Sequence, residues 1–530
     1  MMNAKERDTH LVTARIEYVE VTHAGQAFRL GRYPIHYHLN GNVTGNYVRG
    51  CGIHHTFNRA VTIHAVDYLL VERNVAYNNM GHAYFTEDGI ETNNIIQYNL
   101  AIFTRSSNSL LNVDVTPASY WIVNPDNIVR HNAAAGGSHF AFWYNPPEHP
   151  GGPSYTTSIC PRNVPVQEFT NNTAHSFGWY GLWIFPVYYP MEGGTCDSAV
   201  SAPTVFNGLA AWNCGRGAEV GEVGPVQFHN FITVNNAEAG IEMQTTNDRW
   251  GGPLIKDSTI VGWSALSESK SDECTTAGLK LPKSPYLTVD SVKFFNFDQD
   301  RCAAIRACSH CKPYQGGFEA RFKNIGFFNA PNKAGFQWQH EGWLTDMDGT
   351  LRESGAPGTN YKVLPNNPNL PSDHCDTANM EAYSTGDVAG AVCDDTVDFH
   401  RFAFNNFQPD SFLGKDALFE NAEGTSTVPF KKKRITHPNG WMLTLINGDT
   451  YTMFFDKAGQ ITNISFSGRF DFFGQQDFVL MKHNLTQTPD RFSIVGDDRN
   501  ATAAVPTYAA NTNGDWHFDK SLKEFTYLSK

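Results

Sequence analysis

The segment NVAYNNMGHAYF at residues 74–85 contains the pattern that decides the fold. An Asn is followed by alternating small and apolar residues, then by a polar or glycine turn, then by a small residue and more apolar ones. The pattern returns in NAAAGGSHFAFW (132–143), NTAHSFGWYGLW (172–183), NGLAAWNCGRGAEV (207–220) and NFITVNNAEAGIEM (230–243). Such self-similarity predicts a repeat architecture.

The repeat length indicates which architecture this is. The spacing from Asn207 to Asn230 is close to the shift from Ile53 to Val75, which brings IHHTFNRAVTIH (53–64) onto VAYNNMGHAYFT (75–86). This period is near that of one coil of a parallel β-helix, in which three short strands and their turns form a rung. Helical periodicity is almost absent, whereas short alternating runs bounded by Gly, Asn, Asp or Pro are common. We therefore predict an all-β parallel β-helix.

The recurring Asn has a structural interpretation in this fold. Asn tolerates a left-handed backbone at turns, and its side-chain amide can bond to the next rung. We therefore expect the repeated Asn residues to be scaffold.

The repeats also divide the chain. We expect the β-helix over residues 31–345, with ejected loops at 144–165 and 186–203 where the repeats are widely spaced. Residues 346–395 are rich in Pro, Gly and Asn and predict a loop-rich linker or insertion. Residues 396–530 contain alternating strands without the Asn pattern and predict a smaller C-terminal β region.

Composition excludes several classes of function. The formal net charge is -13, so the chain has no basic surface for nucleic acid. Aromatic residues make up 13% of the chain and charged residues 18%, with 45 Gly and 27 Pro, which is typical of a turn-rich β protein. No apolar run reaches the roughly 18 residues that a membrane-spanning helix needs, so we expect no membrane span within this chain.

Cysteines and glycosylation motifs favour an oxidising, extracellular setting. Cys160 and Cys196 flank one expected insertion, Cys375 and Cys393 flank another, and both pairs are disulfide candidates. The CSHC motif predicts a disulfide at Cys308 or Cys311 in preference to half of a metal site, because no second CxxC follows. The Asn-x-Ser/Thr glycosylation candidates are Asn42, Asn171, Asn463, Asn484 and Asn500.

A histidine-rich region surrounds residues 36–88. The shift that brings Ile53 onto Val75 places His38, Ala60 and His82 in one column, with His36, Asn58 and Met80 in the neighbouring column. It also places His64 beside Thr86, next to two acidic residues. The candidate catalytic residues in this predicted patch are His38, His54, His55, Arg59, His64, His82, Glu87 and Asp88.

Three interpretations of this patch are open. The histidines can be turn residues that bond neighbouring rungs, or they can act on a glycan. In the second case imidazole serves as acid or base, and Arg59 binds a sugar carboxylate. Glu87 and Asp88 are sequence neighbours that would point apart along a strand, which weakens a simple two-carboxylate hydrolase. The third interpretation is a metal site, for which His36 and His38 supply one edge; without a compelling third ligand, we predict no metal.

Aromatic residues suggest a glycan surface elsewhere on the β-helix. The side of a β-helix forms a long shallow groove, and aromatic rings can stack on sugar faces. The glycan-stacking candidates are Trp179, Tyr180 and Trp183.

Longer motifs resemble a known family. GRYPIHYHLNG (31–41), IHHTFNRAVTIH (53–64), GHAYFTEDGIE (81–91) and ASYWIVNPDN (118–127) resemble the fibrocystin-L-like family of ectodomain proteins with G8 domains and parallel β-helix (PbH1) repeats. The similarity is dense between about Arg15 and Gly349. The shorter motifs IHHTF and EDGIE are also similar to the related cell-surface proteins implicated in hyaluronan depolymerisation.

This resemblance implies a right-handed parallel β-helix that is extracellular or at the cell surface. It also implies that residues 1–30 are the end of a G8-like domain or the first rung, and that the chain is a fragment of a larger ectodomain. The expected function is a non-catalytic module for adhesion, coat assembly or glycan recognition. The alternative is a depolymerase of hyaluronan-like acidic glycans.

The partners follow from these expectations. We expect an extracellular glycan or surface protein, or self-assembly of the chain, and no nucleic acid. A platform for a protein partner would show as an exposed apolar patch on the ejected loops. We expect no cofactor, with calcium the one ion considered.

Overall fold

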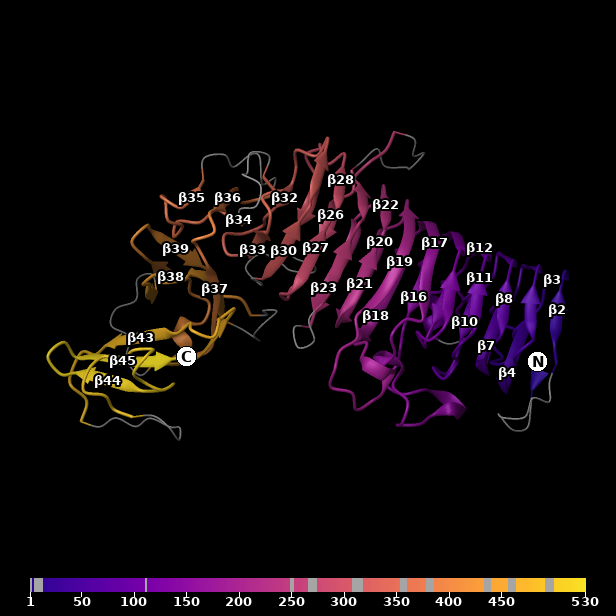
Figure 1. Cartoon of the computed structure of the whole chain (residues 1–530), viewed down its shortest axis with the longest axis horizontal. Helices are drawn as coiled ribbons and strands as arrows, with labels where there is room; N and C mark the ends of the chain where they lie inside the picture. The colour runs from indigo at the N-terminus through magenta and orange to yellow at the C-terminus, as the bar shows by residue number, and fades with distance from the viewer. Residues whose placement is uncertain are drawn as a thin grey trace.

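The computed structural model describes a long coiled body followed by a smaller antiparallel region (Figure 1). Among the described residues there is no α-helix, only strands and short 3-10 segments. The described residues are 2–3, 13–109, 112–247, 252–265, 274–306, 318–352, 360–377, 386–432, 440–455, 464–490 and 500–530.

One wall of the coil is a parallel sheet, here called sheet A. Each of its strands pairs in parallel with the strand one coil further along the chain. Its strands are β1 (Met2–Asn3), β4 (Ile35–Asn42), β7 (Val61–Asp67), β10 (Tyr84–Thr86), β13 (Ala118–Ile122), β16 (Phe140–Tyr144), β18 (Tyr180–Tyr188), β20 (Arg216–Val223), β23 (Ala239–Thr246), β26 (Ala277–Lys280), β29 (Ala303–Arg306) and β32 (Ala334–Gly335).

Two further rows of parallel strands form the other walls. The second row contains β2 (Arg15–Glu17), β5 (Tyr47–Arg49), β8 (Leu70–Glu72), β11 (Ile95–Gln97), β14 (Ile128–Arg130), β17 (Glu168–Phe177), β19 (Thr204–Trp212), β21 (Val226–His229), β24 (Leu254–Lys256), β27 (Leu287–Asp290), β30 (Glu319–Lys323) and β33 (Trp343–Asp346). The third row contains β3 (Glu20–Thr22), β6 (Gly52–His54), β9 (Val75–Tyr77), β12 (Leu100–Thr104), β15 (Ala133–Gly137), β22 (Ile232–Val234), β25 (Thr259–Val261), β28 (Lys293–Phe295) and β31 (Gly326–Phe328). The long strands β17 and β19 continue through both rows. Three walls of parallel strands make a β-helix, so the predicted fold class is confirmed.

Inward-facing side chains fill the coil with one continuous core. Val48, Val71, Ile96, Val129 and Phe169 occupy the same register position in successive strands of the second row, and all are buried. Each apolar side chain therefore packs on its equivalents in the coils before and after it, as close packing of a core requires.

The alignment of equivalent residues across sheet A differs from the predicted one. His38 lies opposite His64, whereas Thr62 lies opposite Phe85, so the first of these coils is longer than the second and both are longer than predicted. The columns predicted from one constant shift are therefore wrong. His38 does not share a column with Ala60 and His82, and His36 lies opposite Thr62 instead of Asn58. The turns differ in length between coils, so no single period describes the chain.

A ladder of buried asparagines links successive coils, as the repeat predicted. The side-chain oxygen of Asn99 accepts hydrogen bonds from the backbone N–H of Asn74 at 3.1 Å and from its side-chain amide at 3.0 Å. Asn132 accepts the same two bonds from Asn99, and Asn172 accepts them from Asn132. Buried backbone donors at the turns thereby find partners, which a fold of this kind must supply. The structural interpretation is confirmed for Asn74, Asn132 and Asn172. Asn207 and Asn230 lie outside this ladder, where the Asn230 amide donates to the Asn207 side-chain oxygen at 2.7 Å.

The pairing changes after β33. β34 (Tyr361–Pro365), β35 (Cys375–Asp376) and β36 (Gly390–Cys393) extend the same sheet in antiparallel fashion. Three small antiparallel sheets follow, and the first two share a phenylalanine-rich core. Their strands are β37 (Phe399–Gln408), β40 (Trp441–Ile446) and β42 (Ser465–Asp471); β38 (Ala417–Glu420), β39 (Thr425–Val428) and β41 (Thr452–Phe455); and β43 (Val479–Asn484), β44 (Trp516–Asp519) and β45 (Glu524–Ser529).

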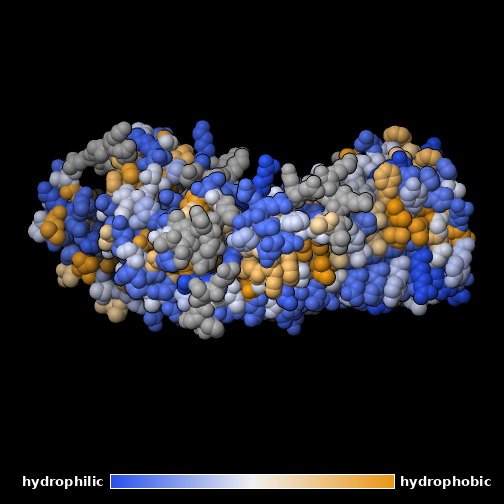
Figure 2. Space-filling view, turned by 90° about the horizontal axis from the view of Figure 1, so that it is seen from above, coloured by the Kyte–Doolittle hydropathy of each residue, from blue (hydrophilic) through white to orange (hydrophobic). Residues whose placement is uncertain are grey.

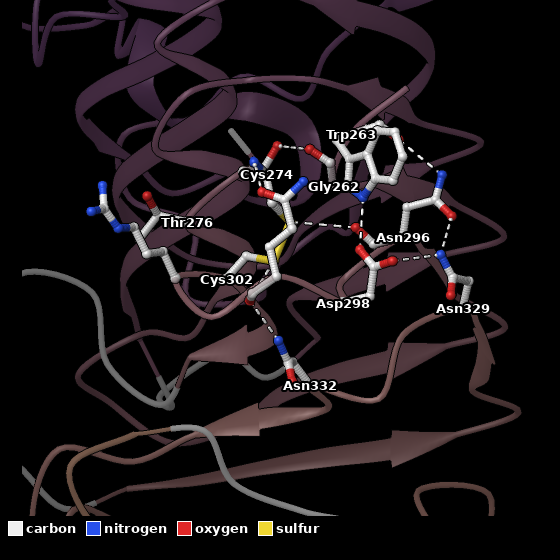
Figure 3. Close-up of a disulfide and its surroundings, with 12 residues drawn as sticks. Gly262, Trp263, Cys274, Thr276, Asn296, Asp298, Cys302, Asn329 and Asn332 are labelled. Atoms are coloured by element: carbon white, nitrogen blue, oxygen red, sulfur yellow. Dashed lines mark hydrogen bonds between the residues drawn. A yellow bond between two sulfur atoms is a disulfide. The ribbon is translucent and has the colours of Figure 1, made fainter. Parts of the chain in front are cut away.

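Two of the disulfide expectations are confirmed. Cys160 pairs with Cys196, and Cys375 pairs with Cys393. A third bridge, between Cys274 and Cys302, was not predicted. It lies beside a turn where Trp263 donates to Asp298 at 2.7 Å and Asn329 donates to Asp298 at 2.9 Å (Figure 3). Cys308 and Cys311 lie outside the described residues.

The surface of the coil is mixed in character. The face shown in Figure 2 has hydrophobic groups toward the N-terminal end and midway along the molecule, separated by hydrophilic residues. No helix within the described ranges has the length and apolar character needed to cross a bilayer.

Removing one rung of the asparagine ladder tests its contribution to stability. Asn99→Ala takes away the acceptor for two donors of Asn74 and a donor to Val71 O, leaving buried polar groups unpaired. We expect the free energy of unfolding to fall by about 2–4 kcal/mol in urea denaturation followed by tryptophan fluorescence. Asn108→Ala, at an exposed loop position, is the control. Equal midpoints for the two variants would contradict the ladder's role.

Candidate functional site

Sheet A brings together three histidines and two acids near the N-terminal end of the coil. His36 and His38 lie on β4, His64 lies on β7, and Glu87 and Asp88 follow β10. The ring of His38 contacts both other imidazoles, with centroid distances of 5.0 Å to His36 and 4.7 Å to His64. We call these five residues the histidine site.

The two acids hold His64 from both sides. Its Nε2 lies 2.9 Å from Asp88 Oδ2, and its Nδ1 lies 3.3 Å from Glu87 Oε2. Burial opposes a charge on this ring, but the hydrogen bond with Asp88 and the charge of Glu87 outweigh burial and raise the pKa of His64. Burial also raises the pKa of Glu87. The Glu87 side chain is 20% exposed, and His38 is half-buried, so the site reaches solvent at these two residues.

His36 has a fixed tautomer. Its Nδ1 lies 3.0 Å from the carbonyl oxygen of Gly31, which can only accept, so Nδ1 carries the proton. Burial lowers the pKa of His36 to about 3, which keeps the ring neutral at physiological pH. Its Nε2 is buried, has no hydrogen-bond partner and lies 4.0 Å from Glu87 Oε2. One nitrogen from each of His36, His38 and His64 lies within 4.8 Å of the others, so these residues could hold a metal ion.

Arg59 and His82 lie beneath the site as a buried structural group. The Arg59 guanidinium donates to both carboxylate oxygens of Asp114, from Nε at 3.0 Å and from Nη2 at 2.7 Å, and neither side chain is exposed. His82 Nδ1 accepts from the backbone N–H of Ala118 at 2.9 Å, and burial lowers the pKa of this ring to about 3. Arg59 is therefore occupied by a buried acid and does not present itself to a substrate carboxylate.

Asp114 was missed by sequence reasoning. It lies in a 3-10 segment (Asn112–Val115) of the loop between β12 and β13, which carries none of the repeat pattern. Asp114 packs against Gly81, and the contact requires glycine there. A Cβ on Gly81 would lie 2.6 Å from Asp114 Oδ1, and Gly81 has a φ of +80°. A glycine at the turn before a strand is too common a feature to identify this contact in advance.

His54 and His55 belong to another wall. His54 ends β6 in the third strand row, where its Nε2 lies 2.8 Å from Glu20 and its Nδ1 lies 2.8 Å from His55 Nδ1. The predicted single patch is therefore wrong for His54 and His55, which lie apart from the other six residues. Arg59 Nη1 lies 3.9 Å from Glu87 Oε1, so the buried Arg59 and His82 group adjoins the histidine site.

The glycan-stacking candidates do share a surface of sheet A. Trp143 and Trp183 occupy one register position, with ring centroids 4.6 Å apart, and Trp183 stacks on Phe185 at 4.4 Å. Tyr180 lies 5.4 Å from Trp183, while Trp179 is 45% exposed. We call Trp179, Tyr180, Trp183 and Phe185 the aromatic platform.

An ionic group that the sequence did not reveal borders this platform. Glu219 and Glu242 follow Trp183 at the same register position in the next two coils. Trp183 Nε1 donates to Glu219 at 3.1 Å, and Arg216 donates to Glu242 at 2.6 Å and to the Tyr180 hydroxyl at 2.9 Å. These partners hold the rings of Trp183 and Tyr180 in place.

The predicted glycosylation positions differ in exposure. Asn171, Asn484 and Asn500 are exposed and Asn42 is half-buried, whereas Asn463 lies outside the described residues. These positions stay predictions.

The N-terminal part of the chain is similar to a known family of β-helices. Residues 7–182 match the family model CEMIP beta-helix, and this range contains the whole histidine site. The human protein Cell surface hyaluronidase CEMIP2 is 32% identical over 33% of this chain and 15% of its own length. Residues 7–182 are therefore similar to a CEMIP β-helix.

The similarity to one group of relatives covers the whole chain. Mouse Fibrocystin-L is 48% identical over all of this chain, and dog Fibrocystin is 26% identical over 96% of it. The resemblance predicted from the sequence is confirmed: the chain is fibrocystin-L-like along its full length. It spans 12% of the length of each of these two relatives.

The buried ion pair below the site provides a stability test. Asp114→Ala leaves the Arg59 guanidinium buried without its acid, and we expect the free energy of unfolding to fall by about 3–5 kcal/mol. Urea denaturation measures this change. The control is Glu17→Ala, which removes the acid of the exposed Arg49 pair, whose N–O distance is 2.6 Å, and should have little effect because solvent screens that pair. Similar midpoint shifts in both variants would show that Arg59 is not held as described.

Proposed function

We propose that this chain is an extracellular β-helix module that binds glycans without cleaving them, in an adhesive or cell-coat role. The aromatic platform is the observation that carries the proposal. Three disulfides among the described residues and the fibrocystin-L-like sequence support the extracellular location.

The platform has the properties of a binding surface. Trp183 and Tyr180 are held by hydrogen bonds to Glu219 and Arg216, and Trp179 packs against the rings of His139 and Phe140, so little conformational entropy is lost when a ligand binds. Trp179 offers an exposed ring beside the half-buried Tyr180 and Trp183. Large, rigid aromatic faces supply contact area for the C–H faces of sugars, while their neighbours supply hydrogen bonds.

The charges beside the platform indicate the sugar class. Two cations, Arg216 and Lys280, are paired there with Glu219, Glu238 and Glu242, giving a formal charge of -1. A polyanionic chain gains no net attraction from such a group. The platform therefore suits neutral sugars better than acidic ones.

Glycan binding can be measured with the exposed ring removed. We expect purified Trp179→Ala to bind immobilised neutral glycans about tenfold more weakly than the unaltered chain, because one stacking face is lost. A panel of neutral glycans with hyaluronan included, read by surface plasmon resonance, gives the affinities. The matched control is Tyr68→Ala, since Tyr68 is 47% exposed on a different part of the coil. No binding by the unaltered chain, or equal losses in both variants, would reject the platform.

A second candidate function is depolymerisation of an acidic glycan at the histidine site. Glu87 favours it, because a partly exposed carboxyl group with a raised pKa can protonate a glycosidic oxygen. The family model CEMIP beta-helix matches the part of the chain that contains this residue, and the named hyaluronidase relative is similar to a third of the chain. Against it, Asp88 is buried and bonded to His64, and Arg59 is bonded to Asp114, so neither is available as a second substrate group.

Size analysis of hyaluronan distinguishes the two candidates. If the second candidate holds, the unaltered chain shortens hyaluronan between pH 4 and 8, and Glu87→Gln reduces the rate at least a hundredfold by removing the acid. Glu168→Gln is the control, since this side chain is 29% exposed and lies away from the site on β17. No shortening by the unaltered chain leaves binding as the function.

A further inference from the structure

The histidine site contains a buried imidazole acceptor, Nε2 of His36, that the described residues leave without a hydrogen-bond donor. In His36, Nδ1 donates to Gly31, so the buried Nε2 has only a lone pair to offer. A buried nitrogen without a donor loses its hydration and gains nothing in return. This nitrogen points toward the Glu87 carboxylate, itself an acceptor, at 4.0 Å.

His64 faces the same carboxylate from β7. Its Nε2 lies 2.9 Å from Asp88 Oδ2 and its Nδ1 lies 3.3 Å from Glu87 Oε2, so a positive charge at Nδ1, from a proton or a metal ion, is matched by both acids. Glu87 Oε2 is buried and without a hydrogen-bond partner. The His36 lone pair, the Nδ1 of His64 and one Glu87 oxygen thus converge, and a metal ion between them would bond to all three by taking the place of a proton on His64 Nδ1.

His38 completes the set from the same strand as His36. Because side chains alternate along a strand, residues 36 and 38 lie on one face, and the pairing with β7 places His38 opposite His64. One nitrogen of each ring lies within 4.8 Å of the others. Nitrogens about 2.0–2.1 Å from a tetrahedral metal ion lie about 3.4 Å apart. Side-chain movements of about 1 Å would therefore bring the three nitrogens to metal-binding distance.

We propose that His36, His38 and His64 bind a zinc-class metal ion, with the Glu87 carboxylate as the fourth ligand. Three imidazoles and one carboxylate suit Zn²⁺ and neighbouring transition metals, whereas Ca²⁺ and Mg²⁺ require a shell of oxygen atoms. The metal gives the unpaired His36 nitrogen a partner and bonds to the other three groups, displacing a proton from His64.

The surroundings fix the ligands as metal sites require. The Gly31 carbonyl and the Asp88 carboxylate each accept from the ring nitrogen that does not face the metal, which sets the tautomers of His36 and His64. The turn that carries Glu87 and Asp88 is held by Glu91, whose carboxylate accepts from the backbone N–H groups of Asp88 at 2.8 Å and Gly89 at 2.7 Å. The site is therefore preorganised.

Metal content tests the proposal separately from glycan binding at the aromatic platform. The chain, purified without a histidine tag and dialysed against Zn²⁺, should retain one zinc per chain by mass spectrometry of the metal. Substitution with Co²⁺ should give the intense visible absorption of a tetrahedral site. Zn²⁺, but not Ca²⁺, should restore the melting temperature that EDTA lowers.

Variants locate the metal. We expect His64→Ala to lose the bound zinc, and Glu87→Gln to weaken zinc binding at least tenfold while keeping the fold, since Glu87 is partly exposed. His54→Ala is the control, because His54 and His55 form a close imidazole pair on another wall of the coil. Zinc that persists in His64→Ala and Glu87→Gln, zinc lost in His54→Ala, or a dissociation constant of the unaltered chain weaker than about 10 µM would overturn the proposal.

Discussion

The amide-to-amide hydrogen bond between successive asparagines is the contact on which this architecture depends. In the ladder, Asn99, Asn132 and Asn172 each offer one oxygen to two donors of the preceding Asn, and each donates its own amide to a carbonyl of the preceding coil. The bonds hold the turns of neighbouring coils in line. Because they fix the turns, the segments between them can vary in length without disturbing the core.

One such insertion supports the histidine site. The chain leaves the coil after β12 and returns at β13, and this excursion carries Asp114 back beneath Arg59. Burying the guanidinium with its acid removes Arg59 from the surface. The buried pair also supports Glu87 and His64 from below. This pair, the ladder and the turn held by Glu91 together keep the five residues of the site in place.

The sequence predicted the fold well because the repeat records the packing directly. Asn at each turn and apolar residues facing inward are needed in every coil, so they recur. The pairing of His38 with His64 could not be predicted, because it depends on a longer coil that lies beside a shorter one. Asp114, Glu219 and Glu242 were not predicted as site residues, because each makes contacts that occur at one place in the coil and leave no periodic pattern in the sequence. The disulfides of Cys160 and Cys375 could be predicted, because each of these residues and its partner flank an insertion. The Cys274–Cys302 disulfide could not be predicted, because nothing in the repeat pattern marks these two residues.

The direction of the strands has a mechanical consequence. The strands lie across the long axis, so the backbone hydrogen bonds between coils run along it (Figure 1). A pull on the two ends of the coil loads these bonds in series, and the coils open one after another from an end. Each coil that opens, such as the one from Thr62 to Phe85, lengthens the chain by about 80 Å. Under tension the molecule would yield in discrete steps and absorb work at each step, with the asparagine ladder setting the force of the steps between residues 74 and 172.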